Sequence, residues 1–131
     1  MRAVHLAEAA AAADSLYAIG YEMYAVDRWR DAADVFRAMV LLWPLDERGW
    51  LGLGRCHDSV GEQPVALELL SLATVAIPRS VRARLALAGI LRDQARHDDA
   101  DRLVDDAERL ANDADQDDLL ELVIAARRRT S

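Results

Sequence analysis

The feature that most constrains this chain is a repeat with a period of 34 residues, which runs three times without a gap. Small residues recur at two interior positions of each unit, and proline ends the first two units. A unit of this length cannot bury a core by itself, so neighbouring units have to stack and share one. The three columns are Gly20, Gly54 and Ala88; Ala32, Ala66 and Ala100; and Pro44, Pro78 and Asn112.

This repeat resembles the tetratricopeptide repeat (TPR), a helix-turn-helix hairpin of the same length. The resemblance implies an all-α fold in which three tandem hairpins form a short right-handed solenoid with a capping helix at each end. Such arrays present a concave binding surface and seldom carry out chemistry. The predicted single domain is 1–131, with repeats at 13–46, 47–80 and 81–114 and capping helices within 1–12 and 115–131.

Helical periodicity predicts which face of each hairpin is buried. In the first repeat, residues spaced i, i+3, i+4 and i+7 form one face of a helix. That face holds Leu16, Ile19, Gly20 and Met23, and the corresponding turns are expected near Asp27, Gly61 and Ala95. A further helix at 117–128, with apolar residues Leu119, Leu120, Val123 and Ile124, is expected to cover the open apolar face of the third repeat.

Charge and cysteine content limit the classes of function. The net charge of −7 disfavours nucleic acid as a partner. Residues 98–121 hold eleven acidic residues against Arg102 and Arg109, a local net charge of −9. This stretch is either the solvated outer face of a terminal repeat or an acidic docking surface for a basic partner. A single cysteine, Cys56, excludes an intramolecular disulfide and fits a reducing cytoplasm.

Neither a membrane span nor an export signal is expected. No apolar run reaches the length that a transmembrane helix needs, so direct membrane insertion is not predicted. The alanine-rich start of the chain is interrupted by Glu8 and continues into a helical pattern without a cleavage-like break. The sequence therefore predicts a cytoplasmic protein.

A second stripe remains on the first helix of each repeat, about 100° from the core face. In the first repeat it holds every tyrosine of the chain, at spacing i, i+4 and i+7. In TPR arrays this stripe lines the concave groove, and tyrosine and arginine are frequent in binding hot spots. Core packing of the tyrosines is the alternative. The predicted groove residues are Tyr17, Tyr21, Tyr24, Arg48, Leu51, Arg55, Leu85 and Arg92.

No catalytic, metal or cofactor site is predicted. Cys56 and His57 are neighbours in sequence, so on a helix they point about 100° apart and cannot act as nucleophile and base. The aspartates at 113–118 resemble the start of a calcium loop, but Asp118 stands where glycine is needed and Ile124 where glutamate is needed. The carboxylate-clamp type of TPR groove is disfavoured, because its lysine and asparagine positions hold Tyr17, Tyr21 and Gly52.

The stretch 17–73 resembles the class II chaperones of bacterial type III secretion. The resemblance rests on the tyrosine stripe, the segment WRDAADVFRAM and the junction LDERGWLGLGRCHDSVGE. It implies a groove that binds an extended segment of a secreted hydrophobic translocator protein and keeps that protein soluble and competent for export. It also admits a homodimer. A generic TPR scaffold that joins folded partners is the alternative function, and an enzyme is not expected.

Overall fold

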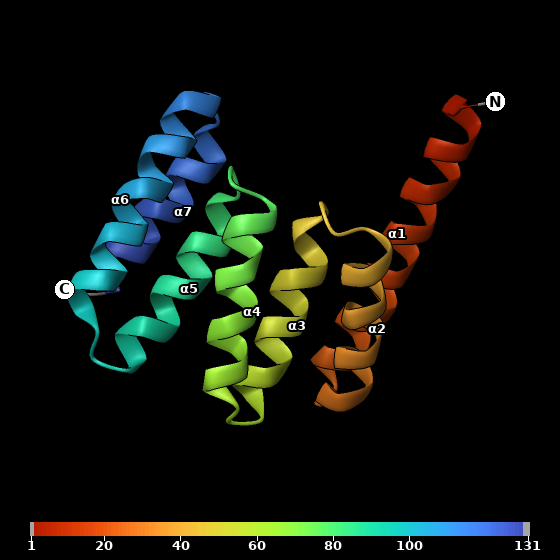
Figure 1. Ribbon diagram of the computed structural model, residues 1–131, viewed down its shortest axis with the longest axis horizontal. Helices are drawn as coiled ribbons and strands as arrows, with labels where there is room; N and C mark the ends of the chain where they lie inside the picture. The colour runs from red at the N-terminus through yellow and green to blue at the C-terminus, as the bar shows by residue number, and fades with distance from the viewer. Residues whose placement is uncertain (1, 130–131) are drawn as a thin grey trace. The chain divides into compact units, whose positions relative to one another are not determined.

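The computed structural model describes residues 2–129, all of which lie in helices or in the short turns between them. No strand occurs within this range, which confirms the all-α prediction. The turns are two to four residues long, as in helical hairpins (Figure 1). The helices are α1 (Arg2–Ala25), α2 (Trp29–Leu42), α3 (Glu47–Ser59), α4 (Gln63–Ala76), α5 (Val81–Asp93), α6 (His97–Ala114) and α7 (Asp117–Arg128).

The described residues divide into two compact units, one within 1–66 and the other within 67–131. The first contains α1, α2, α3 and the start of α4. The second contains the rest of α4 with α5, α6 and α7. Each unit is described below by itself, and the grouping of three repeats into one domain stays a prediction.

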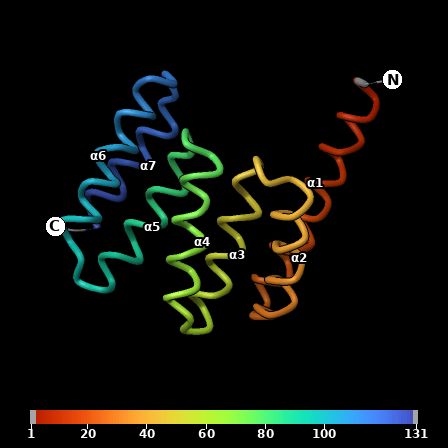
Figure 2. The backbone as a smooth tube through the Cα atoms, in the orientation of Figure 1, coloured from red at the N-terminus to blue at the C-terminus, as the bar shows by residue number. Residues whose placement is uncertain are grey.

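The long helix α1 differs from the prediction of a separate N-terminal helix at 2–12. It runs without a break from Arg2 to Ala25. The stretch between Glu8 and Asp14 consists entirely of alanine, the best helix former, and so contains no glycine or proline that could end a helix. Figures 1 and 2 show the N-terminal part of α1 extending beyond the end of α2, and most side chains of 3–12 are exposed.

The turns fall where the sequence predicts them. Asp27, Gly61 and Ala95 have positive φ angles of 63°, 82° and 60°, so the left-handed residue recurs in the same column of the repeat. Only glycine adopts this conformation without cost, and a left-handed alanine costs about 1 kcal/mol. Each turn is closed by the same backbone bond, donated by the residue after the left-handed one: Arg28 N to Met23 O, Glu62 N to His57 O, and Arg96 N to Leu91 O.

The core of the first unit is organised around Phe36 of α2, which is 3% exposed. Its ring occupies space left by two glycines, one on α1 and one on α3. A Cβ at Gly20 would lie 2.8 Å from the ring, and a Cβ at Gly52 would lie 2.5 Å from it. Gly20, a small residue of the first column, thus allows α2 to approach α1 closely. The columns Gly20, Gly54 and Ala88, and Ala32, Ala66 and Ala100, are buried throughout.

Ile19 was predicted to be a core residue of the first repeat, and this is wrong, since its side chain is 44% exposed. Its counterparts Leu53 and Leu87 are buried. Each of these two belongs to a hairpin that follows another helix in the chain, whereas no helix precedes α1 in the described residues. In α1 the buried line runs instead through Ala13 and Gly20.

In the second unit, α7 packs on both α5 and α6, which confirms that the last helix covers the third hairpin. Leu119, Val123 and Ala126 are the residues it buries. Ile124, which was predicted to share this role, is 50% exposed. It follows Val123 directly and therefore points about 100° away from the buried stripe.

Candidate peptide-binding surface

Six of the predicted groove residues lie on one surface of the first unit, which we call the tyrosine face. It is formed by one stripe of α1 and one stripe of α3, and these two helices pack against each other. The residues of each stripe are three or four positions apart, so they share one side of their helix. The tyrosine face consists of Tyr17, Tyr21 and Tyr24 on α1, with Arg48, Leu51 and Arg55 on α3.

One end of the tyrosine face is fixed by Arg48. Its guanidinium lies 5.0 Å from the centre of the Tyr17 ring, within the range of a cation–π contact. The same group makes an ion pair of 2.9 Å with Asp14 of α1. It also donates two hydrogen bonds, of 3.0 and 2.8 Å, to the two carboxylate oxygens of Asp46. Arg48 thus ties the start of α3 to α1.

Asp46 has a second role, because it is the N-cap of α3. Its Oδ1 accepts a hydrogen bond of 3.1 Å from the backbone N–H of Arg48. The side-chain hydrogen bond from Arg48 lowers the pKa of Asp46 below its usual value, and the pKa of Arg48 is raised mainly by the same bond. Both groups therefore stay charged at neutral pH, and the cation over Tyr17 is permanent.

The other end of the tyrosine face is fixed by Tyr24. Its hydroxyl lies 2.9 Å from the hydroxyl oxygen of Ser59, the last residue of α3. This hydrogen bond uses the polar group of Tyr24, and the ring itself is half-buried. Tyr24 therefore joins α1 to α3 in the same way as Arg48 does at the opposite end of the surface.

The side chains in the middle of the tyrosine face make no hydrogen bond or ion pair within residues 2–129. Tyr21 is 55% exposed, and its ring lies 6.2 Å from that of Tyr17, centre to centre. Leu51 is half-buried, and Arg55 is exposed without an ion pair within residues 2–129. An aromatic ring, an aliphatic side chain and a guanidinium group thus lie on the same two helix stripes, each at least partly exposed.

The three tyrosines do not share one environment. Tyr17 packs against Phe36, at 6.3 Å between ring centres, and lies under Arg48, so it belongs partly to the core. Tyr24 is held by Ser59. Tyr21 is the exposed one of the three, so the two alternatives raised by the sequence apply to different residues of the same stripe.

The second unit holds the other two predicted groove residues. Leu85 is half-buried. Arg92 differs from the prediction, because its side chain does not face an open groove. The Arg92 side chain is only 13% exposed. Its Nη1 donates a hydrogen bond of 3.2 Å to the carbonyl of Ala126 in α7, and its Nη2 lies 3.7 Å from Asp101 of α6. Arg92 faces these two helices because α7 packs beside α5 and presents its terminal carbonyls there.

Sequence reasoning missed three residues that build the tyrosine face: Phe36, Gly52 and Ser59. The position of Phe36 between two glycines of different helices depends on tertiary packing. The bond between Tyr24 and Ser59 joins residues 35 apart. The sequence signal that could have indicated this bond is the repeat itself, because residues about one period apart lie in adjacent repeats. Asp14 and Arg48, which form an ion pair, are also about one period apart.

Three further observations concern metal binding, the reactivity of the cysteine and membrane spans. Among residues 2–129, no group of three or more histidine, cysteine or acidic residues is arranged to hold a metal ion. Cys56 is buried, and burial raises the pKa of its thiol to about 11, so the reactive thiolate is scarce at neutral pH. In the same range, none of the helices has the length and apolar character required to cross a bilayer.

The structure is that of an all-α protein built from TPR-like hairpins, with a partly exposed stripe of aromatic, aliphatic and basic side chains on α1 and α3. No family model matches the chain. Low calcium response locus protein H of Yersinia pestis is 31% identical over 62 residues, which cover 47% of this chain and 37% of that protein. The match thus spans little more than a third of the curated relative's length.

Solved structures extend the likeness over most of the chain. The type III secretion translocator chaperone SycD of Yersinia enterocolitica matches with a TM-score of 0.80 and 25% identity, covering 89% of this chain and 86% of SycD. PcrH from Pseudomonas aeruginosa matches with a TM-score of 0.77 and 29% identity, covering 89% and 87%. PcrH in complex with the chaperone binding region of PopB gives the same TM-score and identity, covering 89% and 93%. The resemblance to type III secretion translocator chaperones is confirmed.

Proposed function

We propose that the protein is a cytoplasmic chaperone that binds an extended segment of a secreted translocator protein and keeps it soluble until export. The observation that carries the proposal is the likeness to PcrH in complex with the chaperone binding region of PopB. A translocator has segments destined for a membrane, and these would associate if left exposed in the cytoplasm. Binding such a segment masks it, so the proposed role is binding and not catalysis.

The tyrosine face supports this role by its pre-organisation. Both of its ends are held by contacts between α1 and α3, through Arg48 and through Tyr24. The side chains between them, Tyr21, Leu51 and Arg55, therefore project from a fixed backbone, which lowers the entropy lost on binding. Tyrosine offers apolar area together with a hydroxyl that can bond to the backbone of an extended peptide.

In the proposed complex, Tyr21 and Leu51 contact apolar side chains of the client and Arg55 contacts a polar or acidic group. Leu85, in the second unit, is proposed as a further contact residue. Arg92 is proposed only as a support for α7, since its side chain is already bonded there. A homodimer, which the resemblance also admits, stays a prediction that light scattering can measure.

The test is co-expression with each translocator protein encoded near the gene, followed by affinity purification of the complex. We expect the wild-type chain to retain one such client. Tyr21→Ala should weaken binding by about 1–2 kcal/mol, as a hot-spot aromatic does, and should leave the melting temperature nearly unchanged. Val75→Ala, which removes a side chain that is 75% exposed in the second unit, serves as the control and should bind normally.

Two results would count against the proposal. If no translocator protein is retained by the wild-type chain, the chaperone function fails and the alternative of a scaffold for folded partners gains support. If a translocator is retained but Tyr21→Ala binds as tightly as wild type, the function stands and the tyrosine face is not its site.

A further inference from the structure

The helix α5 of the second unit contains an exposed glycine that its own structure does not require. Gly89 lies inside Val81–Asp93, and a Cβ built on it would meet no atom within 4 Å. It also lacks the positive φ angle that Gly61 has in its turn. Glycine is less favourable than alanine inside a helix, because it loses more conformational freedom on folding. Gly89 therefore destabilises α5, and no contact within residues 2–129 explains its presence.

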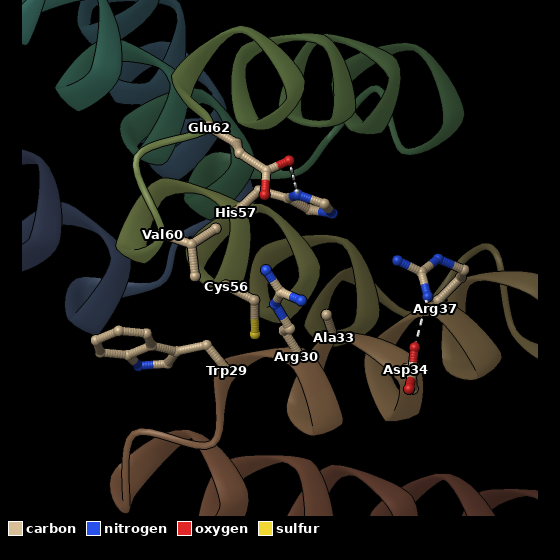
Figure 3. A pocket seen from close by; sticks show the side chains of 9 residues that line it. All are labelled: Trp29, Arg30, Ala33, Asp34, Arg37, Cys56, His57, Val60 and Glu62. Atoms are coloured by element: carbon tan, nitrogen blue, oxygen red, sulfur yellow. Dashed lines mark hydrogen bonds and ion pairs between the residues drawn. The ribbon is translucent and has the colours of Figure 1, made fainter.

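The repeat places Gly89 in the same column as two residues of the tyrosine face. Tyr21, Arg55 and Gly89 follow one another at the period of 34 residues. The residue after each of the last two shows which side of the helix is buried. Figure 3 shows Cys56 pointing toward α2, and Ile90, in the same column, is buried as well. Consecutive helix residues point about 100° apart, so Gly89, like Arg55, lies away from the buried side of its helix.

The surroundings of Gly89 on α5 are mostly apolar. Leu85 and Ala86, which lie one turn earlier, are half-buried. Arg92 lies one turn later, but its guanidinium is hydrogen-bonded to a carbonyl of α7. Asp93, at the end of α5, is exposed. An uncharged patch therefore extends from Gly89 toward Leu85, in the direction away from Asp93, and it has no side chain at the glycine itself.

We propose that Gly89 is a contact site for the client segment, at which one bulky apolar side chain of the client lies against the bare backbone of α5. Leu85 and Ala86 flank this side chain, and covering them removes apolar area from water. Glycine is the residue that lets a ligand approach a backbone closely, and an alanine or leucine here would occupy the client's place. The inference rests on the proposed chaperone function and names what the client has to present to the second unit.

The first measurement compares folding and binding in the full-length protein. Gly89→Ala should raise the melting temperature by about 2–5 °C, because alanine is the better helix former and its Cβ has open space. Affinity is measured with the part of the retained translocator that the wild-type chain protects from proteolysis. It should fall about five-fold in Gly89→Ala and further in Gly89→Leu, since both side chains overlap the client. Stability and affinity thus change in opposite directions.

A matched control places the same leucine elsewhere in the second unit. Arg102 of α6 is 79% exposed, and Arg102→Leu should bind the segment like wild type. If Arg102→Leu weakens binding as much as Gly89→Leu does, the effect belongs to any exposed leucine and the proposal fails.

A second measurement identifies the client side chain that lies on Gly89. Each bulky apolar residue of the segment is replaced in turn by alanine, and the affinities are measured for wild type, Gly89→Leu and Tyr21→Ala. One replacement should weaken binding to wild type and restore binding to Gly89→Leu, because the space that it vacates accepts the new leucine. The same replacement should not restore binding to Tyr21→Ala, whose change lies in the first unit.

The remaining outcomes separate this inference from the function on which it rests. If no translocator is retained by the wild-type chain, the chaperone function fails and the inference fails with it. If a translocator is retained and Gly89→Leu binds it as tightly as wild type, the function stands and Gly89 is not a contact. A lower melting temperature in Gly89→Ala would show that the glycine serves the fold. If no replacement in the client compensates Gly89→Leu, a bulky apolar side chain does not occupy the site.

Discussion

The two units carry equivalent helices, yet equivalent positions on these helices have different surroundings. In the first unit, α1 and α3 present Tyr21, Leu51 and Arg55, and none of these side chains makes a hydrogen bond or ion pair within residues 2–129. In the second unit the counterpart of Arg55 is Gly89, which has open space around it, and Arg92 is held by α7 and α6. A few side chains thus give the same hairpin different surroundings in the two units.

In the second unit, the last helix, α7, covers the hairpin formed by α5 and α6. The buried stripe of α7, Leu119, Val123 and Ala126, fills the place beside α5 and α6. Arg127 of α7 also lies 2.8 Å from Asp105 and from Glu108 of α6. Part of the acidic stretch is therefore already paired within this unit. The first unit has no comparable cover, since Ile19 of α1 is exposed where its counterparts are buried.

The largest expected effect on stability is at Phe36, whose buried ring fills the space between α1 and α3 in the first unit. Phe36→Ala should lower the free energy of unfolding by about 3–5 kcal/mol, because it leaves a cavity between two glycines. Gly52→Ala should also destabilise, by about 1–3 kcal/mol, since its Cβ would overlap the ring. Denaturant unfolding measures both. In the double variant the second cost should largely disappear, and simple additivity would contradict the packing described for this unit.

A substitution of Arg92 tests whether this side chain holds α7 in place in the second unit. Arg92→Leu should lower stability by about 1.5–3 kcal/mol, because it removes a charge-assisted hydrogen bond to the carbonyl of Ala126. Hydrogen exchange should show faster exchange in α7 while α2 and α3 are unchanged. Client binding should persist. The exposed Arg102 provides the control, and its leucine variant should melt like wild type. Loss of binding without loss of stability would restore Arg92 to the binding surface.

A smaller effect distinguishes the helix caps of the two units. Asp46 caps α3 and Ser80 caps α5 in the same position of the repeat, so each alanine variant should cost about 1 kcal/mol. The two should differ in their dependence on pH. The pKa of Asp46 is lowered in the folded protein, so its contribution is present above the unfolded pKa of about 4 and is lost as pH falls through the folded pKa.

Thermal melts at decreasing pH measure this difference. The gap between wild type and Asp46→Ala should be full at neutral pH and should shrink below about pH 4. The gap between wild type and Ser80→Ala should stay constant over the same range, since a hydroxyl cap does not titrate. If both gaps shrink together, the acid sensitivity arises elsewhere and the ion pair of Asp46 with Arg48 is not its cause.

The sequence determined the helices and their turns, since these depend on local spacing. The period placed left-handed residues at Asp27, Gly61 and Ala95, and it identified the small buried columns. It failed where a side chain's surroundings depend on which helices lie beside it. Ile19 has the spacing of a core residue but lacks the covering helix that its counterparts have, and Ile124 lies beside the buried stripe of α7 and not on it. The break expected near residue 12 is absent, because the alanines there favour a continuous helix.

Only the tertiary structure decided which polar and aromatic residues remain free. From the sequence, the three tyrosines are equivalent members of one stripe, and Arg48, Arg55 and Arg92 are equivalent cations. In the structure, hydrogen bonds and ion pairs commit Tyr24, Arg48 and Arg92 to holding helices together, while Tyr21 and Arg55 remain available. Periodicity gives the side of a helix on which a residue lies. It cannot give the partner across the interface, because that depends on contacts between residues a full repeat apart.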